Sequence, residues 1–207
     1  MKKVEVLREL TNNLKYRESD IEKLELFHAE LLKYNKKYNL ISSSTENDVW
    51  TRHILDSAQL TKFINFDNNE SLSDMGSGAG FPGILIALFN NNPKFHVKLY
   101  EKSSVKRDFL NNMREKMNLV YEVIGDYKNE IISSEYVVSR AFKKLNELII
   151  ISREIIKVNH KLIILKGKNA ELEIKNLQPE LNYRYDLKES ITDKDSKIVI
   201  IDFKKYK

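Results

Sequence analysis

Alternating glycines in one short segment suit the binding of a small ligand. The segment runs from Asp74 to Gly83 and reads Asp-Met-Gly-Ser-Gly-Ala-Gly-Phe-Pro-Gly. Such glycines let the backbone bend tightly and approach a ligand closely. The residues before the segment predict a strand and those after it a helix, so the segment should lie at the carboxyl edge of a sheet, where ligands collect. We therefore predict a ligand-binding loop rather than a glycine-rich turn without a ligand.

Two classes of cofactor fit this loop. The Gly-x-Gly-x-x-Gly pattern that starts at Gly78 matches the dinucleotide fingerprint of nicotinamide oxidoreductases. Asp74, two residues before Gly76, completes a D-x-G-x-G-x-G pattern that resembles motif I of S-adenosylmethionine-dependent methyltransferases. Glu101, at the end of the next expected strand, could bind both ribose hydroxyls in either class. The chain after its helical start is too short for the separate catalytic domain of most dehydrogenases, so S-adenosylmethionine is favoured.

Short β-like runs alternate with helical patterns from Ser71 onward, which is typical of a doubly wound α/β sheet. The expected strands are Ser71–Met75, Phe95–Tyr100, Val120–Ile124, Tyr136–Ser139, Lys161–Leu165, Tyr183–Leu187 and Lys197–Phe203. The expected helices between them are Pro82–Asn90, Val105–Met117, Leu145–Val158 and Ala170–Leu177. Because no helix separates the last two strands, we expect a hairpin that adds an antiparallel strand.

Helical spacing dominates the first part of the chain. Apolar residues recur with this spacing along Glu22–Tyr38, where Asp20 is the expected N-cap, and a further helix is expected from about Ser44 to Leu60. We predict a Rossmann-like methyltransferase fold of the α/β class, with a seven-stranded, mainly parallel sheet, an antiparallel last strand and an N-terminal helical cap. Residues 1–65 would form the helical segment packed on the core, and residues 66–207 the methyltransferase core, as one compact unit.

Composition limits the function classes. The 207 residues are 42% hydrophobic and 31% charged, which suits one domain with a substantial core. No apolar run approaches the roughly 18 to 20 residues of a membrane span and no signal peptide is evident, so we expect a cytoplasmic protein without membrane contact. Cysteine is absent and the four histidines lack metal-ligand spacing, so no metal is expected. The net charge of +5 favours a polyanionic partner such as RNA, but a general compositional bias would also produce it.

The residues after the fourth expected strand bear on the methylated atom. Methylation of an exocyclic amine commonly uses an Asn/Asp-Pro-Pro-aromatic clamp at this place, where the chain instead has Val138-Ser139-Arg140-Ala141-Phe142. Carbon-5 methylation of a pyrimidine commonly needs a cysteine, which is absent. N7 of guanine has an exposed lone pair and no proton, so its methylation needs positioning rather than a strong base. The sequence is compatible with this last reaction.

Six motif blocks occur in order over about residues 20–170. They are Tyr38-Asn39-Leu40, Arg52-His53-Ile54-Leu55-Asp56-Ser57, Asp74 to Gly83, Lys106-Arg107 with Phe109-Leu110, Ser139-Arg140-Ala141-Phe142, and Leu165-Lys166-Gly167. The glycine loop is common to many methyltransferases, whereas the second and fifth blocks are far more specific. Together the blocks resemble the bacterial 16S rRNA guanine-N7 methyltransferase family called RsmG or glucose-inhibited division protein B.

The resemblance implies transfer of a methyl group from S-adenosyl-L-methionine to N7 of a specific guanine of 16S small-subunit rRNA, guanine 527. The partner would be 16S rRNA or the small ribosomal subunit, and we expect the enzyme to act as a monomer. Two rivals remain at this point. One is a methyltransferase of the same fold that acts on another RNA or on a small molecule, and the other is a non-catalytic nucleotide-binding protein.

The resemblance also implies where the cofactor binds. Tyr127 and Lys128 would lie beside the adenine, and Arg140 would complete the pocket. Glu101 stands where the family often has Asp, a change that keeps the carboxylate. From the loop pattern and the resemblance together, the expected cofactor contacts are Asp74, Gly76, Gly78, Gly80, Phe81, Glu101, Tyr127, Lys128 and Arg140.

Arg52, His53 and Asp56 fall on adjoining turns of one expected helix, so they can interact. The spacing alone suits an ion pair on a solvated face, whereas the resemblance favours a cluster that faces the cofactor or the target base. Arg140 follows the fourth expected strand, where it would reach a phosphate or the guanine. We predict Arg140, His53 and Arg52 as catalytic residues.

Three further cations are candidates for RNA contact. Lys106 and Arg107 lie in the first turn of their helix, where the helix dipole disfavours positive charge. Lys166 follows the fifth expected strand, at the same edge as Arg140. We predict RNA contacts for all three; a surface pair of Lys106 or Arg107 with Asp108 or Glu101, or a solvated Lys166, would be the alternatives.

Overall fold

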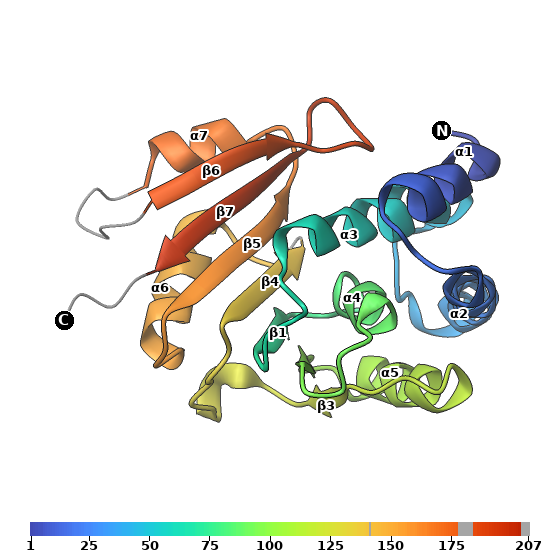
Figure 1. Ribbon diagram of the computed structural model, residues 1–207, viewed down its shortest axis with the longest axis horizontal. Coiled ribbons are helices and arrows are strands. Elements are labelled where there is room, and N and C mark those ends of the chain that lie inside the picture. Colours follow the sequence, from blue (N-terminus) through green and yellow to red (C-terminus); the bar gives the residue numbers. More distant parts are fainter. Residues whose placement is uncertain (141, 178–183, 204–207) are drawn as a thin grey trace.

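The computed structural model describes residues 1–140, 142–177 and 184–203, which form one seven-stranded sheet flanked by helices (Figure 1). The strands are β1 (Ser71–Met75), β2 (His96–Tyr100), β3 (Glu122–Ile124), β4 (Tyr136–Arg140), β5 (His160–Lys166), β6 (Arg184–Glu189) and β7 (Lys197–Phe203). Their order is β3-β2-β1-β4-β5-β7-β6. All neighbours are parallel except those that involve β7. The predicted mixed sheet is confirmed.

The last two strands form the predicted hairpin, but β7 does not lie at the edge of the sheet. It pairs antiparallel with both β5 and β6 and so runs between them. β6 is the edge strand and is exposed along most of its length, which suits a strand that carries Arg184, Lys188 and Glu189. Tyr183, the first residue of the expected strand, lies outside the described residues.

Side chains of the inner strands alternate between two hydrophobic clusters, one on each face of the sheet. On β5, Ile163 and Leu165 join the larger cluster, whereas Leu162 and Ile164 join the smaller one. This alternation follows from the two-residue period of a strand. Because both faces are covered, β5 and β7 each contain a run of four consecutive apolar residues, Leu162–Leu165 and Ile198–Ile201.

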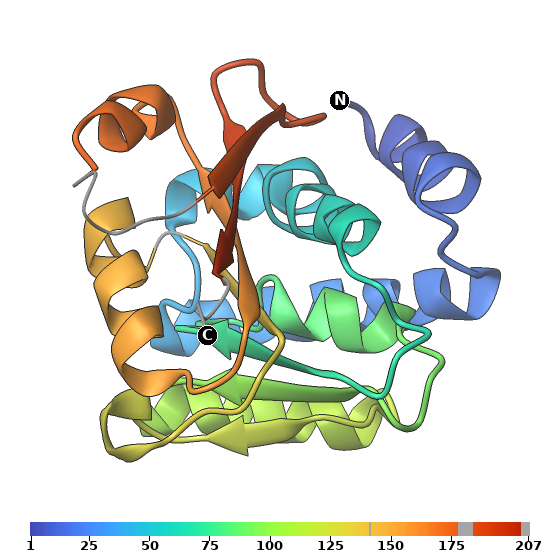
Figure 2. The same cartoon turned by 60° about the vertical axis from the view of Figure 1, so that its left-hand side comes forward.

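Helices cover both faces of the sheet. They are α1 (Lys3–Arg8), α2 (Glu18–Tyr38), α3 (Asp56–Ala58), α4 (Gly83–Phe89), α5 (Ser104–Lys116), α6 (Leu145–Ile155) and α7 (Ala170–Lys175). In Figures 1 and 2, α6 and α7 lie together on one side of the C-terminal strands, apart from the N-terminal helices. The clusters agree: α6 and α7 contribute to the smaller one, and α1, α2, α4 and α5 to the larger one.

The N-terminal helices share a core with the sheet. The ring of Phe27 on α2 lies 5.3 Å from that of Phe81 and 6.1 Å from that of Phe109, between ring centroids. The hydroxyl of Tyr16 donates to the carbonyl of Leu85 at 3.0 Å. The division into segments 1–65 and 66–207 therefore remains an interpretation. Within the described ranges, no helix has the length and apolarity needed to cross a membrane.

Two details of the helical segment differ from expectation. α2 begins at Glu18 rather than after Asp20, because the carboxylate of Asp20, in the first turn, reaches back to accept from the Arg17 amide at 2.9 Å. The helix expected from Ser44 to Leu60 is instead a series of short helices. These are the 3-10 turn Ser43–Asp48, the π-helical turn Trp50–Leu55, α3 and the 3-10 turn Gln59–Phe63.

The glycine loop follows β1 at the carboxyl edge of the sheet, as predicted. The amides of Gly76 and Ser77 both donate to the carbonyl of Tyr100 at the end of β2, at 2.9 and 3.0 Å. Gly76, Gly78 and Gly80 have φ values of 75°, 57° and 96°. Residues with side chains rarely adopt these angles, so the glycines allow this path. These hydrogen bonds hold the loop against the end of β2, the strand that Glu101 directly follows.

Replacing Gly83 with alanine should destabilise the fold. A Cβ there would overlap the side chain of Leu99 and lie 2.6 Å from Oδ2 of Asp74. Overpacking of a filled core costs about 1–3 kcal/mol of unfolding free energy. Gly167→Ala is a matched control because no heavy atom lies within 4 Å of its added Cβ. Chemical denaturation should show a loss for G83A alone, and equal stability of the two variants would contradict this packing.

Candidate active site

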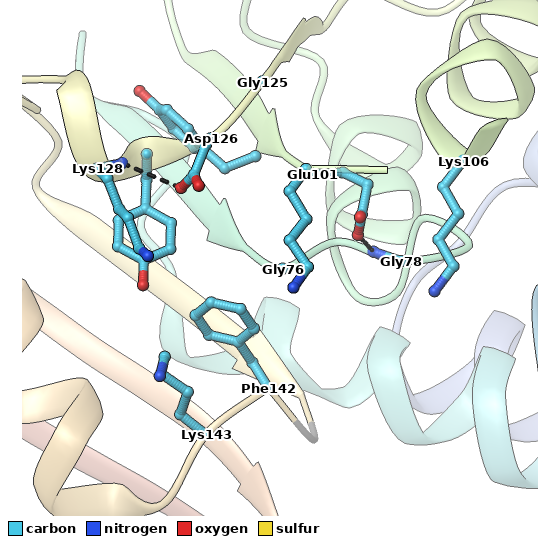
Figure 3. A pocket seen from close by; sticks show the side chains of 12 residues that line it. Gly76, Gly78, Glu101, Lys106, Gly125, Asp126, Lys128, Phe142 and Lys143 are labelled. Carbon is cyan, nitrogen blue, oxygen red and sulfur yellow. Dashed lines mark hydrogen bonds between the residues drawn. The ribbon is translucent and has the colours of Figure 1, made fainter. Parts of the chain in front are cut away.

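An open pocket of about 450 Å³ lies beside the glycine loop (Figure 3). Its walls come from the carboxyl ends of β1, β2 and β3 and from the chain after β4, the edge expected from sequence. Among the expected cofactor contacts, those that line the pocket are Gly76, Gly78, Glu101, Tyr127 and Lys128.

Glu101 joins the loop to the pocket. Its carboxylate accepts from the Gly78 amide at 2.9 Å and from the Ser103 amide at 2.8 Å. The side chain is only 7% exposed and is held in one orientation by these two donors. Each carboxylate oxygen retains a second lone pair. Glu101 is therefore ready to accept hydrogen bonds from a pair of ribose hydroxyls.

Two residues that sequence reasoning did not assign to the cofactor also form the pocket. Asp126 follows β3, and its carboxylate accepts from the Lys128 amide at 3.2 Å. Phe142 lies over Gly76, where an added Cβ would overlap its ring, and it meets Tyr127 edge-on at 5.7 Å between centroids. A polar residue two positions after the third strand and the aromatic residue of the Ser139 to Phe142 block were the available signals.

Asp74 lies behind the loop rather than in the pocket. It is fully buried, and its Oδ2 accepts from the Gly83 amide at 2.9 Å. Burial raises the pKa of Asp74 to about 7, against the opposing effect of the Gly83 amide. Asp74 thus joins the end of β1 to the start of α4, and its predicted cofactor contact stays a prediction.

Phe81 and Gly80 are also expected cofactor contacts, and this expectation stays a prediction. Phe81 is 2% exposed, and its ring lies 5.2 Å from that of His53 and 4.9 Å from the guanidinium carbon of Arg140. Gly80 provides a backbone bend beside Ile84, whose side chain an added Cβ would overlap. Both residues shape the loop and the apolar support under Arg140, outside the lining of the pocket.

Arg140 and His53, two of the predicted catalytic residues, lie in contact. Nη2 of Arg140 lies 2.7 Å from Nδ1 of His53, and Nη1 donates to the carbonyl of Arg52 at 3.0 Å. Nε2 of His53 lies 2.8 Å from the hydroxyl of Thr45, which donates in turn to the carbonyl of Ser42. A chain of hydrogen bonds therefore fixes the Arg140 guanidinium from the helical segment.

The contact with Arg140 determines which ring nitrogen of His53 carries the proton. Because guanidinium only donates, Nδ1 of His53 must accept and its Nε2–H must donate to Thr45. Burial, together with the positive charges of Arg140 and Arg52, lowers the pKa of His53 to about 3. Burial also lowers the pKa of Arg140, but a guanidinium stays charged at neutral pH. His53 is thus a neutral positioning group for Arg140.

The alternative of an ion pair between Arg52 and Asp56 is not what the structure shows. The carboxylate of Asp56 accepts instead from Gln59, from Ser190 at 3.2 Å and from Thr192 at 2.9 Å. Burial raises the pKa of Asp56, whereas its two hydroxyl donors oppose the rise. The loop between β6 and β7 is therefore joined to the helical segment that carries His53.

The three cations predicted to contact RNA have different surroundings. Lys106 lines the pocket at the start of α5. Arg107 instead donates to the carbonyls of Glu101 and Lys102 at 3.0 and 2.7 Å, so it fixes the end of β2. Lys166 donates to the carbonyl of Lys143 and to Glu173, both at 2.8 Å, and its side chain is only 11% exposed. Arg107 and Lys166 are thus held by groups of the protein itself, and the RNA contacts of all three cations stay predictions.

Acid should destabilise the protein through His53. Its folded-state pKa of about 3 lies below the unfolded value of 6.5, so only the unfolded state takes up the proton as the pH falls through this range. Between pH 7 and about 4.5 this costs about 2.5 kcal/mol of unfolding free energy. His53→Asn keeps an acceptor for Arg140 without this titration and should lose about 2.5 kcal/mol less. Denaturant unfolding at both pH values checks this, and identical losses would contradict the neutral state of His53.

The sequence is similar to those of known proteins along most of its length. A family described as rRNA small subunit methyltransferase G matches residues 20–200. The chain belongs to this family. Ribosomal RNA small subunit methyltransferase G of Rickettsia bellii (strain OSU 85-389) is 36% identical over 182 residues, 87% of this chain and 92% of that protein. The protein of the same name from Pelagibacter ubique (strain HTCC1062) is 34% identical over 197 residues, 92% of this chain and 91% of its own.

Solved structures confirm the Rossmann-like methyltransferase fold. A SAM-dependent methyltransferase from Aquifex aeolicus superposes with a TM-score of 0.59 at 14% identity, covering 81% of this chain and 96% of its own. M. jannaschii TYW2 in complex with AdoMet has a TM-score of 0.54 at 16% identity and covers 72% of this chain and 74% of its own. With the family membership, this makes the chain an S-adenosylmethionine-dependent rRNA methyltransferase.

The pocket fits S-adenosylmethionine. Glu101 presents its carboxylate for a ribose diol, and Gly76 and Gly78 leave the loop without side chains on the pocket side. Tyr127 and Asp126 supply an aromatic and a polar wall for an adenine. Across the described part of the chain, no three His, Asp or Glu side chains are grouped so as to hold a metal ion.

Proposed function

We propose that this protein transfers the methyl group of S-adenosylmethionine to N7 of guanine 527 in 16S small-subunit rRNA, acting as a monomer in the cytoplasm. The observation that carries the choice of atom is the neutral, doubly hydrogen-bonded His53 beside Arg140. A histidine whose Nδ1 accepts from a guanidinium is not available as a general base. N7 of guanine carries no proton, so a site without such a base suits it.

Arg140 would position the target base. Two of its donors are held by His53 and the Arg52 carbonyl, while a guanidinium has five donors in a planar fork. The others suit an acceptor oxygen of the substrate, either guanine O6 or a backbone phosphate. Arg52 takes part through its carbonyl, and its exposed side chain is available for RNA.

The remaining pocket residues would bind and orient the cofactor, which supplies an electrophilic methyl group when bound. Glu101 would accept from the ribose hydroxyls, and Asp126, Tyr127 and Lys128 would flank the adenine. Phe142, over Gly76, would exclude water from the reacting side of the loop. Lys106, at the mouth of the pocket, would pair with an RNA phosphate. Such positioning converts an encounter of two substrates into an effectively unimolecular in-line transfer.

The test is methylation with labelled S-adenosylmethionine of three substrates: unmethylated small subunits, their naked rRNA, and tRNA. Digestion to nucleosides should give labelled 7-methylguanosine from the subunits or the rRNA. A different methylated base would contradict the proposed atom. Label in tRNA alone would favour another RNA substrate, and cofactor binding without label in any RNA would favour a small-molecule substrate or a nucleotide-binding role.

A further inference from the structure

A second, smaller groove lies between α2 and α5, outside the cofactor pocket. It has a volume of about 190 Å³ and is lined by Glu30, Lys33, Tyr34, Lys37, Tyr38 and Lys116. Tyr38 belongs to the Tyr38-Asn39-Leu40 block noted in the sequence, for which the cofactor pocket gives no role. We call this feature the lysine–tyrosine groove.

The groove is positively charged. Its one carboxylate, Glu30, is 13% exposed and lies 2.8 Å from the ammonium of Lys116 and 3.9 Å from that of Lys33. Lys37 has no acidic partner in the ranges that the structure describes. Three ammonium groups therefore face one carboxylate that is already neutralised, and the excess charge suits an anion such as a phosphate.

The groove also holds a fixed, exposed aromatic face. Tyr34 is fixed because its hydroxyl accepts from the amide of Asn112 at 2.7 Å and its ring packs 5.1 Å from Phe109. Tyr38 lies 6.1 Å from Tyr34 between ring centroids and is 49% exposed. An exposed tyrosine supported by a second ring is a surface on which an unpaired base can stack.

Helix α5 connects the groove to the active site. Lys106, near its first residue, lines the cofactor pocket, and Lys116, its last residue, lines the groove. With 1.5 Å of rise per residue, the two lysines are about 15 Å apart along the helix, the axial length of about four stacked nucleotides. One strand of RNA can therefore contact both ends of α5.

We propose that the lysine–tyrosine groove binds a single-stranded segment of the rRNA substrate a few nucleotides from the target base. Lys33 and Lys37 bind its phosphates, and Tyr38 stacks on one of its bases. Cations beside an exposed aromatic ring form the usual arrangement for binding single strands without reading their sequence. This proposal rests on the proposed function, and it adds a site at which the substrate is held.

The lysine test measures the affinity of the protein for 16S rRNA and for a short oligouridylate over a range of salt concentrations. The double variant Lys33→Ala, Lys37→Ala should bind both RNAs about tenfold more weakly near 0.1 M salt and show a salt slope smaller by about 1.4, as expected for two lost contacts to a single strand. Lys36→Ala is the matched control. Lys36 lies on α2 between the two lysines in sequence, but it does not line the groove.

The tyrosine test separates stacking from charge. Tyr38→Ala should weaken oligouridylate binding about fivefold or more with little change in salt slope, whereas Tyr38→Phe keeps the ring and should bind as the wild type does. S-adenosylmethionine binding, measured by calorimetry, should be unchanged in all four variants because the groove does not touch the cofactor pocket. If the double lysine variant has an altered melting temperature or cofactor affinity, Lys37→Gln alone would replace it, and Tyr38→Leu would replace Tyr38→Ala in the same case.

The outcomes that would overturn this proposal differ from those that would overturn the proposed function. Unchanged RNA affinity in the double variant and in Tyr38→Ala would overturn the groove, even if the wild type methylates rRNA. An equal loss in Lys36→Ala would overturn it too, since general surface charge would then explain the effect. If the wild type methylates no rRNA but the groove variants still lose oligouridylate binding, the groove stands and the proposed function falls.

Discussion

Replacing Arg140 with alanine is expected to lower kcat for rRNA methylation by about 10²- to 10³-fold, the usual cost of removing a fixed donor from an active site. The guanidinium is fixed by His53, by the Arg52 carbonyl and by the ring of Phe81 beneath it. The alanine substitution removes this fixed donor group. Because Arg140 does not line the cofactor pocket, the Kd for S-adenosylmethionine should change far less than kcat.

Two controls separate this role from a structural one. Truncation also leaves Nδ1 of His53 without its donor, which should cost about 1–3 kcal/mol of stability, so the melting temperature must be measured with the rate. Arg140→Lys keeps the positive charge but loses the planar fork. We expect it to recover stability while methylation remains at least tenfold impaired, as estimated from the loss of one base contact. A kcat within twofold of wild type in Arg140→Ala would remove this residue from the mechanism.

Replacing Glu101 with alanine is expected to raise the Kd for S-adenosylmethionine about 100-fold, which corresponds to about 2.7 kcal/mol. Two effects combine. The carboxylate that would accept from the ribose hydroxyls is lost, and the amides of Gly78 and Ser103 lose their acceptor, which frees the loop. Calorimetric titration with S-adenosylmethionine measures the change without any RNA.

The matched variants for this position are Glu101→Asp and Glu101→Gln. Aspartate keeps the charge with a shorter reach, and we expect a Kd within about tenfold of wild type, the equivalent of one weakened hydrogen bond. Glutamine keeps the shape but loses the charge and one acceptor, so its Kd should lie between those of the aspartate and alanine variants. Equal affinity in wild type and Glu101→Ala would mean that the ribose lies elsewhere.

The parts of the fold set by local pattern were predictable. Each expected strand of the sheet appears within two residues of its predicted start, because apolar runs between turn signals define buried strands. The loop from Asp74 to Gly83 was predictable for a similar local reason. Its backbone adopts positive φ angles at three positions, and glycine is the residue that adopts them readily. The choice of His53 and Arg140 as site residues followed from the family resemblance.

Features of the site that depend on contacts between distant parts of the sequence were not predictable. No local signal shows that Arg140 would contact Nδ1 of His53, or that Thr192 would approach Asp56 from the far end of the sequence. The same limit explains Arg107 and Lys166. Sequence shows a cation at the ligand edge, but whether it points to solvent or to a nearby carbonyl depends on packing. For Asp74 too, the pattern does not distinguish a residue that touches a ligand from one that supports the loop.

The most direct test of the central claim is the position of the methyl group. Small subunits that lack the modification would be treated with the wild-type protein and S-adenosylmethionine, and their rRNA would be cut into fragments for mass spectrometry, with Arg140→Ala treated in parallel. We predict one added methyl group, at N7 of guanine 527, in the wild-type reaction, and almost none with the variant. A methyl group at another atom or nucleotide, or equal transfer by the variant, would contradict the account.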